Sequence, residues 1–491
     1  MSTNNGSLKT KVIKGGGWMI LTRLITRVAG FAVSMVLARL LAPEAYGLVA
    51  VGTLTISLLT VFTEVGFQQS LIQKSGDIEP MLDTAWTVGV LRGIAISLGM
   101  IVFAPWIARF FDLIDAIPIV RVLSLQPFIY SLTNINVVFF RKELDFYKQF
   151  LYEVSAILGN LTVGIGLALL WQNAWALVFG QLTSVLIQVI VSFLLDPSFP
   201  KFKLNFDYFS DLYDFGKWVF LSGIVSYFTL KGDTFFVGRL FDEKTLGLYS
   251  MAYRIANIPV NELKNSLTRV LFPTYASIQN SQNRLTNAFI TAYELLSGIM
   301  VPASIGLMLV AHDFVNIFLG DQWLDMVPLL RILGLGAATR ALVVAGSGFT
   351  YGIGKPRINF YQNLGSGFFL VISLLILPSK IGILGVGWAV IVANIVSFLI
   401  GMYFITSRAK VDLRKWMLGL FPIFISIIPM VISVKIISPI FQRSLVRLIF
   451  SSLGGALFYF VFVLFLGSLM NRSSIRLFKK FSKRLLRISP F

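Results

Sequence analysis

Long apolar runs, separated by short polar segments, are the dominant pattern of this 491-residue chain. A helix that crosses the hydrocarbon core of a bilayer needs roughly 20 predominantly apolar residues, and runs of that length recur throughout the chain. Charged residues, prolines and glycines divide them into fourteen predicted spans. The predicted spans are residues 17–41, 46–72, 82–108, 117–139, 149–171, 174–195, 211–240, 246–275, 287–311, 327–350, 358–377, 383–406, 417–437 and 445–470. The pattern predicts an all-α integral membrane protein with about 14 transmembrane helices.

The composition leaves little sequence for a large soluble domain. Hydrophobic residues make up 56% of the chain and charged residues 13%, and the mean hydropathy is +0.79. The sequence contains no Cys and a single His, which argues against disulfides, thiolate metal sites and clusters of imidazole ligands. We therefore expect neither a metal nor an organic cofactor.

An internal repeat relates the first two predicted spans to the seventh and eighth. At an offset of 200 residues, and without gaps, seven identities fall between residues 16–48 and residues 216–248. The identical pairs are Gly16 and Gly216, Trp18 and Trp218, Leu21 and Leu221, Arg39 and Arg239, Leu40 and Leu240, Gly47 and Gly247, and Leu48 and Leu248. Because six spans separate the copies, both copies cross the membrane in the same direction, as in transporters with two parallel lobes.

The repeat predicts two lobes of six helices followed by an extra helix pair. The predicted parts are a cytoplasmic N-terminal tail (1–16), an N-lobe of helices 1 to 6 (17–195), a cytoplasmic inter-lobe linker (196–210), a C-lobe of helices 7 to 12 (211–406), the extra pair of helices 13 and 14 (407–470) and a basic cytoplasmic tail (471–491).

The net charge of +19 is a feature of the loops rather than a nucleic-acid footprint. The segments between spans form two alternating sets, and 23 of the 42 Lys and Arg residues fall in one set while four fall in the other. The four are Arg109, Lys244, Lys380 and Arg443. By the positive-inside rule the basic set is cytoplasmic, and it includes both termini.

The remaining basic residues lie within or at the ends of the predicted spans. Five of them are expected to lie deepest: Arg23, Arg27, Arg92, Arg254 and Lys264. A charge at the bilayer centre costs about 2.5 to 3.5 kcal/mol even on a mild scale, so such residues normally face a bundle interior or a watery cavity. We predict a cationic cavity for an anionic cargo.

Few acidic residues accompany these cations within the predicted spans. They are Glu64, Glu153, Asp233, Glu262 and Glu294, of which Glu64, Asp233 and Glu294 are the candidates for ion coupling. Glu64 is the foremost candidate, because it is the one acid on the long polar stripe of the second predicted span and its repeat equivalent is Lys264. A carboxylate in such a position can bind a proton or sodium ion differently in two conformations.

Polar residues recur at helical spacing in the second and eighth predicted spans. The two stripes are Thr53, Ser57, Thr60, Glu64 and Gln68, and Arg254, Asn257, Asn261, Lys264 and Thr268. Such a stripe either lines a cavity or forms hydrogen bonds between helices. The length and charge of these stripes favour the cavity.

Five sequence strings carry a family resemblance. They are "VLARLLAPEAYGLVAV" (36–51), "FTEVGFQQSLIQK" (62–74), "FFRKELDFYK" (139–148), "RVLFPTYASIQ" (269–279) and "FLGDQWLDMVPLLRIL" (318–333). In order and spacing they are similar to the polysaccharide transporter flippases of the multidrug/oligosaccharidyl-lipid/polysaccharide (MOP) exporter superfamily, and most of all to the colanic-acid, O-antigen and exopolysaccharide branch. The resemblance covers nearly the whole chain.

This resemblance implies a function as well as a fold. It implies a flippase, not an enzyme, that moves undecaprenyl-diphosphate-linked oligosaccharides across the bacterial inner membrane by alternating access, for O-antigen, capsule or exopolysaccharide biosynthesis. Some members of the superfamily couple to an ion gradient, so coupling to protons or sodium is left open. The implied partners are the lipid-linked oligosaccharide, membrane lipids, and the polysaccharide polymerase and chain-length machinery, with no nucleic acid.

Two alternatives remain open. A multidrug exporter of the same superfamily shares the two-lobed fold, although a cavity for lipophilic cations should be more acidic or aromatic than this one. A membrane-embedded polysaccharide polymerase or ligase is less well supported, because it needs a sizeable outer loop and the longest outer segment, residues 312–326, is short.

The distribution of loop charge predicts the membrane topology. Both termini and the loops at 140–148 and 407–416 should be cytoplasmic, whereas residues 312–326 should be periplasmic. We expect an alkaline phosphatase fusion at Gly320 to be active and a cytoplasmic reporter fused at the same position to be inactive. The reverse result would overturn the orientation.

Overall fold

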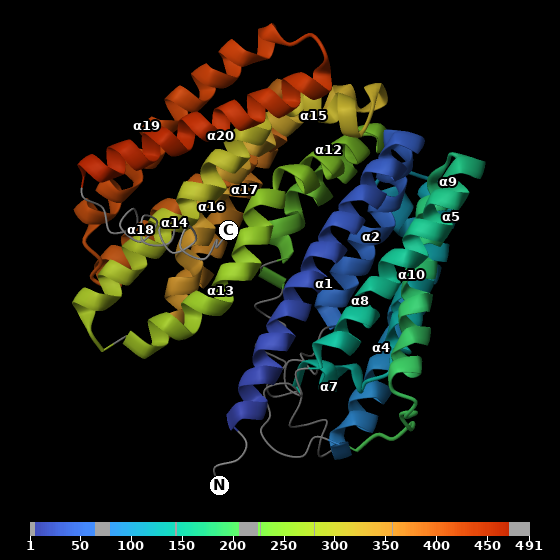
Figure 1. Ribbon diagram of the computed structural model, residues 1–491. Helices are drawn as coiled ribbons and strands as arrows, with labels where there is room; N and C mark the ends of the chain where they lie inside the picture. Colours follow the sequence, from blue (N-terminus) through green and yellow to red (C-terminus); the bar gives the residue numbers. More distant parts are fainter. Residues whose placement is uncertain are drawn as a thin grey trace, which may run out of the picture. The chain divides into compact units, whose positions relative to one another are not determined.

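The computed structural model describes residues 5–63, 79–142, 145–205, 224–225, 227–278, 280–355 and 357–470 (Figure 1). In these ranges the chain forms helices joined by short turns, and no strand occurs. Eleven helices within the described residues are long and apolar enough to cross a membrane. The predicted all-α membrane fold is confirmed, and the protein is a multi-pass membrane protein.

The eleven apolar helices correspond to eleven of the fourteen predicted spans. The predicted span 117–139 is instead divided among three short helices, α5 (Ala116–Leu123), α6 (Leu125–Ser131) and α7 (Val137–Lys142). The predicted span 246–275 is two more polar helices, α12 (Glu243–Ala256) and α13 (Ile258–Ile278). Of the predicted span 211–240 the structure describes residues 224–225 and 227–240, which are helical.

The chain forms two compact units that divide between Ser250 and Met251. The first unit contains the helical residues 227–240 and the first turns of α12 as well as most of the predicted N-lobe. The predicted lobes, 17–195 and 211–406, stay a prediction.

The first unit is a bundle of long helices with shorter ones packed between them. Its long helices are α1 (Asn5–Leu40), α2 (Pro43–Thr63), α4 (Glu79–Phe110), α8 (Phe146–Gly159) and α10 (Ala174–Leu195). Its core contains Leu37 and Leu41 at the end of α1, Leu123 of α5 and Leu177 of α10, all buried. These side chains hold the short helix α5 against the ends of α1, α2 and α10.

Helices α8 and α10 approach each other closely at small residues. A π-helix, η1 (Asn160–Gly164), joins α8 to α9 (Ile165–Trp171). A Cβ on Gly159 would lie 2.8 Å from Cα of Ser184, and a Cβ on Gly180 would lie 2.9 Å from Cα of Gly164. Small residues at both levels let the helix backbones touch, which is a common source of packing energy between helices in membranes.

The segment that follows α10 is fixed to α4 by its backbone. The N–H groups of Lys201, Lys203 and Asn205 donate to side-chain oxygens of α4. The acceptors are Asp83 Oδ1 at 2.9 Å, Thr87 Oγ1 at 3.0 Å and Thr84 Oγ1 at 3.2 Å. The described half of the predicted linker therefore lies along the first bundle as an extended strap.

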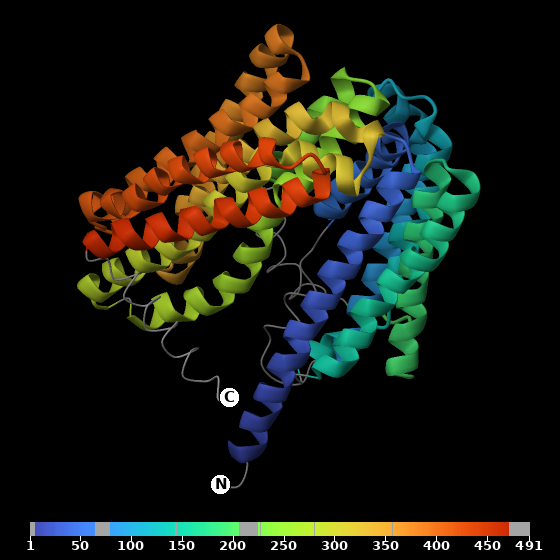
Figure 2. The same cartoon turned by 45° about the horizontal axis from the view of Figure 1, so that its top comes forward.

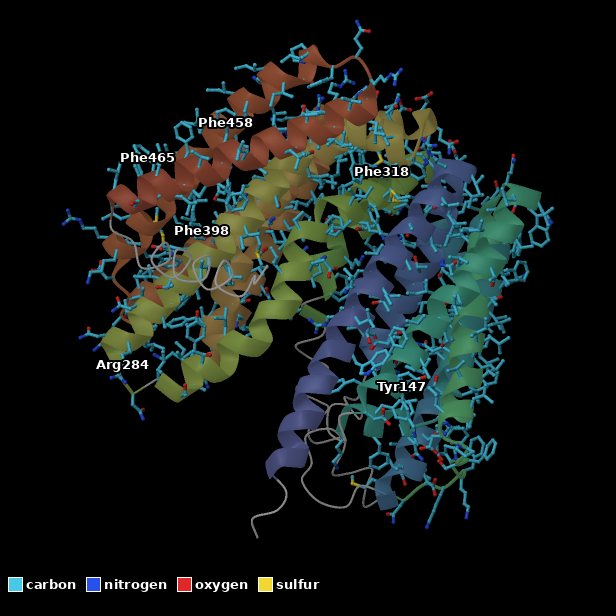
Figure 3. The ribbon with its side chains drawn as sticks, viewed as in Figure 1. Tyr147, Arg284, Phe318, Phe398, Phe458 and Phe465 are labelled. Atoms are coloured by element: carbon cyan, nitrogen blue, oxygen red, sulfur yellow. The ribbon has the colours of Figure 1, made fainter. Side chains whose placement is uncertain are left out.

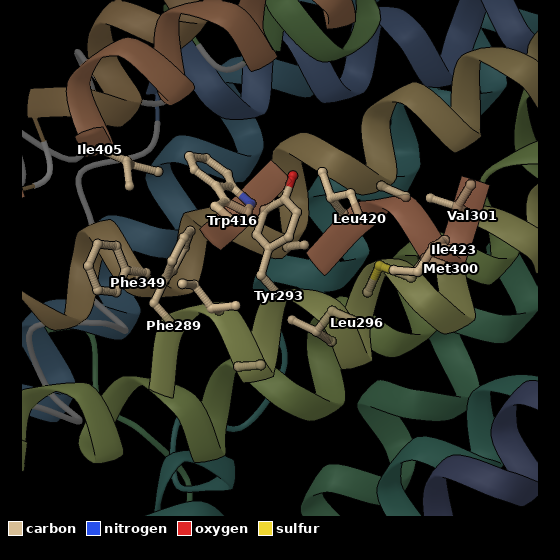
Figure 4. Close-up of a cluster of buried hydrophobic side chains, with 14 of the residues drawn as sticks. Phe289, Tyr293, Leu296, Met300, Val301, Phe349, Ile405, Trp416, Leu420 and Ile423 are labelled. Atoms are coloured by element: carbon tan, nitrogen blue, oxygen red, sulfur yellow. The ribbon is translucent and has the colours of Figure 1, made fainter. Parts of the chain in front are cut away.

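The second unit is also a bundle of helices. They are α13, α14 (Gln282–Leu309), α15 (Ala311–Phe318), α16 (Val327–Gly352), α17 (Arg357–Ile381), α18 (Ile383–Arg408), α19 (Leu413–Ile437) and α20 (Ser444–Leu469). Helices α19 and α20 lie side by side as the predicted extra pair (Figure 2). An aromatic core joins α19 to α14, because the ring of Trp416 lies 5.0 Å from the rings of both Phe289 and Tyr293 (Figure 4). The core continues to α16, because the ring of Phe349 lies 4.4 Å from that of Phe289.

The outer surface of the helices is apolar. On α20, Phe458 and Phe465 project from the helix with 44% and 59% of their surface exposed (Figure 3). Contiguous exposed apolar surface of this kind is costly in water and is normal against lipid tails.

Polar side chains cap several helices where they begin. Asp145 accepts a hydrogen bond from the N–H of Lys148 at the start of α8, and Asp412 accepts one from Lys415 at the start of α19. Asp242 accepts the Thr245 N–H at 2.9 Å, and the hydrogen bonds from Thr245 hold the pKa of this carboxyl below its usual value. A cap of this type stabilises a helix by about 1 kcal/mol.

An ion pair joins the short helix α15 to α20. Arg447 donates from Nε to Asp313 Oδ2 at 2.7 Å and from Nη2 to Oδ1, so the pair is bidentate. Asp313 is buried. A bidentate Arg–carboxylate pair has well-defined geometry, and loss of one member leaves the other charge without a partner.

We expect Arg447→Gln to destabilise the protein by about 1 to 3 kcal/mol, because Asp313 would keep a buried charge and lose its bidentate partner. The double variant with Asp313→Asn should recover part of the loss, since neither charge remains. Thermal unfolding in detergent measures both effects, with Arg443→Gln as the control because Arg443 is exposed one turn earlier. Equal melting temperatures for Arg447→Gln and the control would contradict the expectation.

Candidate functional site

Arg92 is held against the polar stripe of α2. Its Nε donates to Thr63 Oγ1 at 2.9 Å and its Nη2 donates to the carbonyl oxygen of Thr60 at 2.8 Å. Thr60 is on the predicted stripe, and Thr63 is the last residue of α2. The hydrogen bonds fix a guanidinium of α4 beside α2 within the membrane-spanning part of the first unit.

The stripe on α2 also forms hydrogen bonds between helices. Ser57 Oγ donates to the carbonyl of Leu54 and lies 3.1 Å from the hydroxyl oxygen of Tyr227. The Thr53 hydroxyl donates to the carbonyls of Val49 and Ala50 of its own helix. Ser57 therefore forms a hydrogen bond between helices, which is one of the two interpretations of the stripe. The carbonyl of Thr60 instead binds Arg92.

Arg23 and Arg27 lie one turn apart on α1. Arg23 is half-buried and Arg27 is exposed. The hydroxyls of Thr22 and Thr26 donate to carbonyls of their own helix, at Trp18 and Thr22. This local bonding removes the cost of placing the two hydroxyls in an apolar bundle.

In the second unit the polar stripe is interrupted where α12 meets α13. Asn257 occupies the turn between the two helices, and Pro259, which follows two residues later, has no N–H to continue the α12 hydrogen-bond ladder. The side chain of Asn257 is buried, and its Nδ2 donates to the carbonyl of Tyr253 at 2.9 Å. Its Oδ1 is thereby turned toward α16.

Arg340 of α16 binds to this break in the helix. Its Nη1 donates to Asn257 Oδ1 at 2.8 Å and to the hydroxyl of Tyr253 at 3.2 Å. Both bonds use the same nitrogen, so among the described residues the edge formed by Nε and Nη2 is left for another partner. Lys264, on α13, lies within electrostatic range of this guanidinium.

Two of the predicted cations, Arg254 and Lys264, belong to the same pair of helices, and both are exposed at the surface of the unit. Lys264 interacts electrostatically with Arg340, and Arg254 follows Tyr253 on α12; we call these three residues of α12, α13 and α16 the break-site cations. Arg340 was not among the residues that the sequence singled out, and its signal was an Arg in the middle of the apolar span 327–350.

The predicted ion-coupling acids have different surroundings. Asp233 is buried and accepts hydrogen bonds from the Tyr249 hydroxyl at 2.8 Å and from the N–H of Thr234 at 2.6 Å. Glu294 is buried on α14, and a Cβ on Gly419 of α19 would overlap its Oε1. Glu64 lies outside the described residues.

The predicted site residues are divided between the two units. Those of the first unit are Arg23, Arg27, Arg92 and Asp233, and the other described candidates belong to the second.

The fold is similar to that of a known transporter. The chain aligns with a solved structure described as "Lipid II flippase MurJ, inward closed conformation" with a TM-score of 0.74 and 16% identity, over 92% of this chain and 99% of that chain. At this identity the likeness shows the fold alone. The chain therefore has the fold of that protein, and its long apolar helices make it a multi-pass membrane protein.

Sequence relatives narrow the class to a family. The chain is 25% identical to the lipopolysaccharide biosynthesis protein WzxC of Escherichia coli (strain K12), over 87% of this chain and 88% of that protein. It is 23% identical to the succinoglycan biosynthesis transport protein ExoT of Rhizobium meliloti (strain 1021), over 82% and 84%. A family model described as "Polysaccharide biosynthesis protein" matches residues 36–328. The chain belongs to this polysaccharide biosynthesis protein family, and the predicted resemblance to polysaccharide flippases is confirmed.

Proposed function

We propose that the protein is a flippase that moves undecaprenyl-diphosphate-linked oligosaccharide repeat units across the bacterial inner membrane by alternating access. The observation that carries the proposal is Arg340, a guanidinium in the middle of an apolar helix that is anchored through one nitrogen. Polar atoms of Asn257 and Tyr253 hold it in place. The proposal agrees with the membership in a polysaccharide biosynthesis family.

The chemistry of a diphosphate fits the break-site cations. A guanidinium presents its N–H groups as a fork that matches two phosphate oxygens, and a Lys adds a mobile point charge. Arg254 and Lys264 lie on the same helix pair as the anchoring residues of Arg340, so several charges are offered to one headgroup. A cargo with two phosphates offsets the electrostatic repulsion among these cations.

The alternatives receive less support from the described residues. A lipophilic cation, as in a multidrug exporter, would be repelled by Arg254, Lys264 and Arg340. A polymerase or ligase needs a loop that holds catalytic residues, whereas the outer segment near 312–326 consists of α15 and a turn of 3₁₀-helix, Asp321–Met326. We propose cytoplasmic termini and contacts with the polymerase and chain-length machinery as parts of the same function.

Neutral replacement of the cations tests the cargo chemistry. We expect Arg340→Gln, Arg254→Gln and Lys264→Gln, and likewise Arg23→Gln, Arg27→Gln and Arg92→Gln, to lower the export of lipid-linked oligosaccharide about tenfold each. A charge-assisted hydrogen bond is worth about 1.5 to 3 kcal/mol, which exceeds one factor of ten. Arg340→Lys should also be impaired, because it keeps the charge but loses the fork.

The control for this experiment is Arg331→Gln, an exposed Arg nine residues earlier on the same helix. Export is measured in a reconstituted assay with lipid-linked oligosaccharide, and the amount of membrane-inserted protein is measured alongside. The control should export at the wild-type level, and wild-type export by all six neutral replacements as well would dismiss the cationic cavity.

The source of energy is tested through the three candidate acids for ion coupling, Glu64, Asp233 and Glu294. We expect at least one of Glu64→Gln, Asp233→Asn and Glu294→Gln to flatten the dependence of export on an imposed proton or sodium gradient, since a coupling ion must bind differently in the two conformations. Glu64→Gln is expected to show the strongest effect. If all three variants keep the wild-type gradient dependence while export is slower, the coupling acid lies elsewhere.

A further inference from the structure

Three segments form a single surface at one end of the second unit. They are the loop between α16 and α17, the loop between α18 and α19, and the start of α14. Lys355 Nζ donates to the carbonyl oxygen of Arg408 at 2.6 Å, which joins the two loops. Gln282 Nε2 donates to the carbonyl oxygen of Ala409 at 2.8 Å, which joins the start of α14 to the second loop. The three segments are therefore fixed to one another by hydrogen bonds.

Five exposed cations on this surface form no ion pair with an acid of the described residues. They are Lys355, Arg357, Arg408, Lys410 and Arg414, which we call the loop cations. The acid of the second loop, Asp412, is already engaged, because it accepts the N–H of Lys415 and lies 3.8 Å from Lys415 Nζ. Within the described chain, the charge of the loop cations is left for a partner outside the protein.

One loop cation has a position that does not favour the helix that carries it. Arg357 is the first residue of α17, whose first turn contains no acid. The start of a helix carries a partial positive charge, which an acid stabilises and a cation does not. An anion at this position can accept hydrogen bonds from the free N–H groups of the first turn and from the guanidinium together. The start of α17 is therefore suited to an anion.

Lys410 has a backbone conformation that favours glycine. Its φ is 53°, in the left-handed region, where a residue with a Cβ is strained and glycine is not. The side chain of Lys410 forms no hydrogen bond or ion pair with the described residues. Contacts within the described chain therefore do not account for a Lys at this position, whereas an external anion does.

Aromatic side chains indicate the depth of the surface in the membrane. Tyr351 near the end of α16, Tyr361 near the start of α17 and Tyr403 near the end of α18 are exposed, and the ring of Tyr361 stacks on that of Phe404 at 5.3 Å. Exposed Tyr residues collect at the headgroup level of a bilayer. The loop cations follow about one helical turn beyond these rings, so they lie among the headgroup phosphates. The positive-inside rule assigns this level to the cytoplasmic leaflet.

We propose that the loop cations bind the headgroup phosphates of anionic phospholipids of the cytoplasmic leaflet. Charge complementarity selects this occupant, because the surface is cationic and anionic lipids supply the negative charge at this level of the membrane. A bound phosphate at the start of α17 links the two loops and stabilises the second unit. The loop cations are distinct from the break-site cations, and the proposal does not depend on the identity of the cargo.

The test measures lipid binding to the purified protein in detergent by native mass spectrometry, with phosphatidylglycerol as the anionic lipid and phosphatidylcholine as the zwitterionic one. We expect the triple variant Arg357→Gln, Lys410→Gln and Arg414→Gln to bind phosphatidylglycerol about a hundredfold more weakly, since each cation near an anionic surface contributes about fivefold. The three side chains have no bond to the described residues. The melting temperature without lipid should therefore be unchanged, while the rise that phosphatidylglycerol gives the wild-type protein is lost.

A matched control removes the same charge from the other end of the same unit. Lys380, Lys435 and Arg443 are also exposed, and their triple replacement by Gln should leave phosphatidylglycerol binding at the wild-type level. The variant Arg357→Lys, Lys410→Arg and Arg414→Lys keeps all three charges and should retain most of the binding.

Three outcomes would overturn the proposal. The first is wild-type affinity of the triple variant for phosphatidylglycerol, which would leave the surface to another occupant such as an acidic protein. The second is an equal loss in the control, because net charge alone would then decide. The third is equal binding of both lipids by the wild-type protein. If the triple variant cannot be purified, Lys410→Gln decides, with a fivefold loss expected and an unchanged affinity overturning the site. These measurements use no lipid-linked oligosaccharide, so failure of the proposed function leaves their result intact.

Discussion

The bilayer interior offers a backbone amide no water to bond with, so each segment inside it must satisfy its own hydrogen bonds. The described chain meets this constraint with helices alone. Side-chain hydroxyls follow the same rule, because Thr22, Thr26 and Thr53 all donate to carbonyls of their own helices. Polar residues can then recur along a span without separate partners, which allows a polar stripe to exist within an apolar bundle.

Guanidinium groups are stabilised differently, by hydrogen bonds to other segments of the chain. Each of three Arg residues binds oxygen atoms outside its own helix. Arg92 binds a carbonyl and a hydroxyl of α2, and Arg340 binds the Asn257 amide and the Tyr253 hydroxyl. Arg447 binds the carboxylate of Asp313. Each Arg therefore joins two helices as well as carrying a charge. The partners also differ in their effect on that charge, since Asp313 neutralises Arg447 whereas the neutral partners of Arg340 leave its charge intact. Only the second arrangement suits the binding of an anion.

The sequence predicted those features that depend on a single segment. Eleven spans could be located because length and apolar content decide whether a helix can cross a membrane. The division of the span 246–275 was missed although Pro259 marks it, because the polar residues around it continue at helical spacing. Without that break, Asn257 was assigned to the cavity-lining stripe rather than to a hydrogen bond with another helix.

Features that join distant segments could not be predicted. Arg340 is separated from Tyr253 and Asn257 by more than 80 residues, and Arg447 from Asp313 by 134. The residues around each member of these contacts do not indicate which helices will be neighbours. The repeat did pair Gly47 with Gly247 as equivalent residues, but equivalence does not imply contact, and only the packed helices show that the two meet.

The π-helix between α8 and α9 sets the rotational phase of α9. Gly159 and Gly164 are five residues apart, and in an α-helix with 3.6 residues per turn they would point about 140° away from each other. Their neighbours on α10, Ser184 and Gly180, are four residues apart and share a face. The wider turn at Asn160–Gly164 absorbs the extra residue, so that five positions on one helix match four on the other. Every side chain of α9 therefore has an orientation that a regular helix from Phe146 would assign to the residue before it.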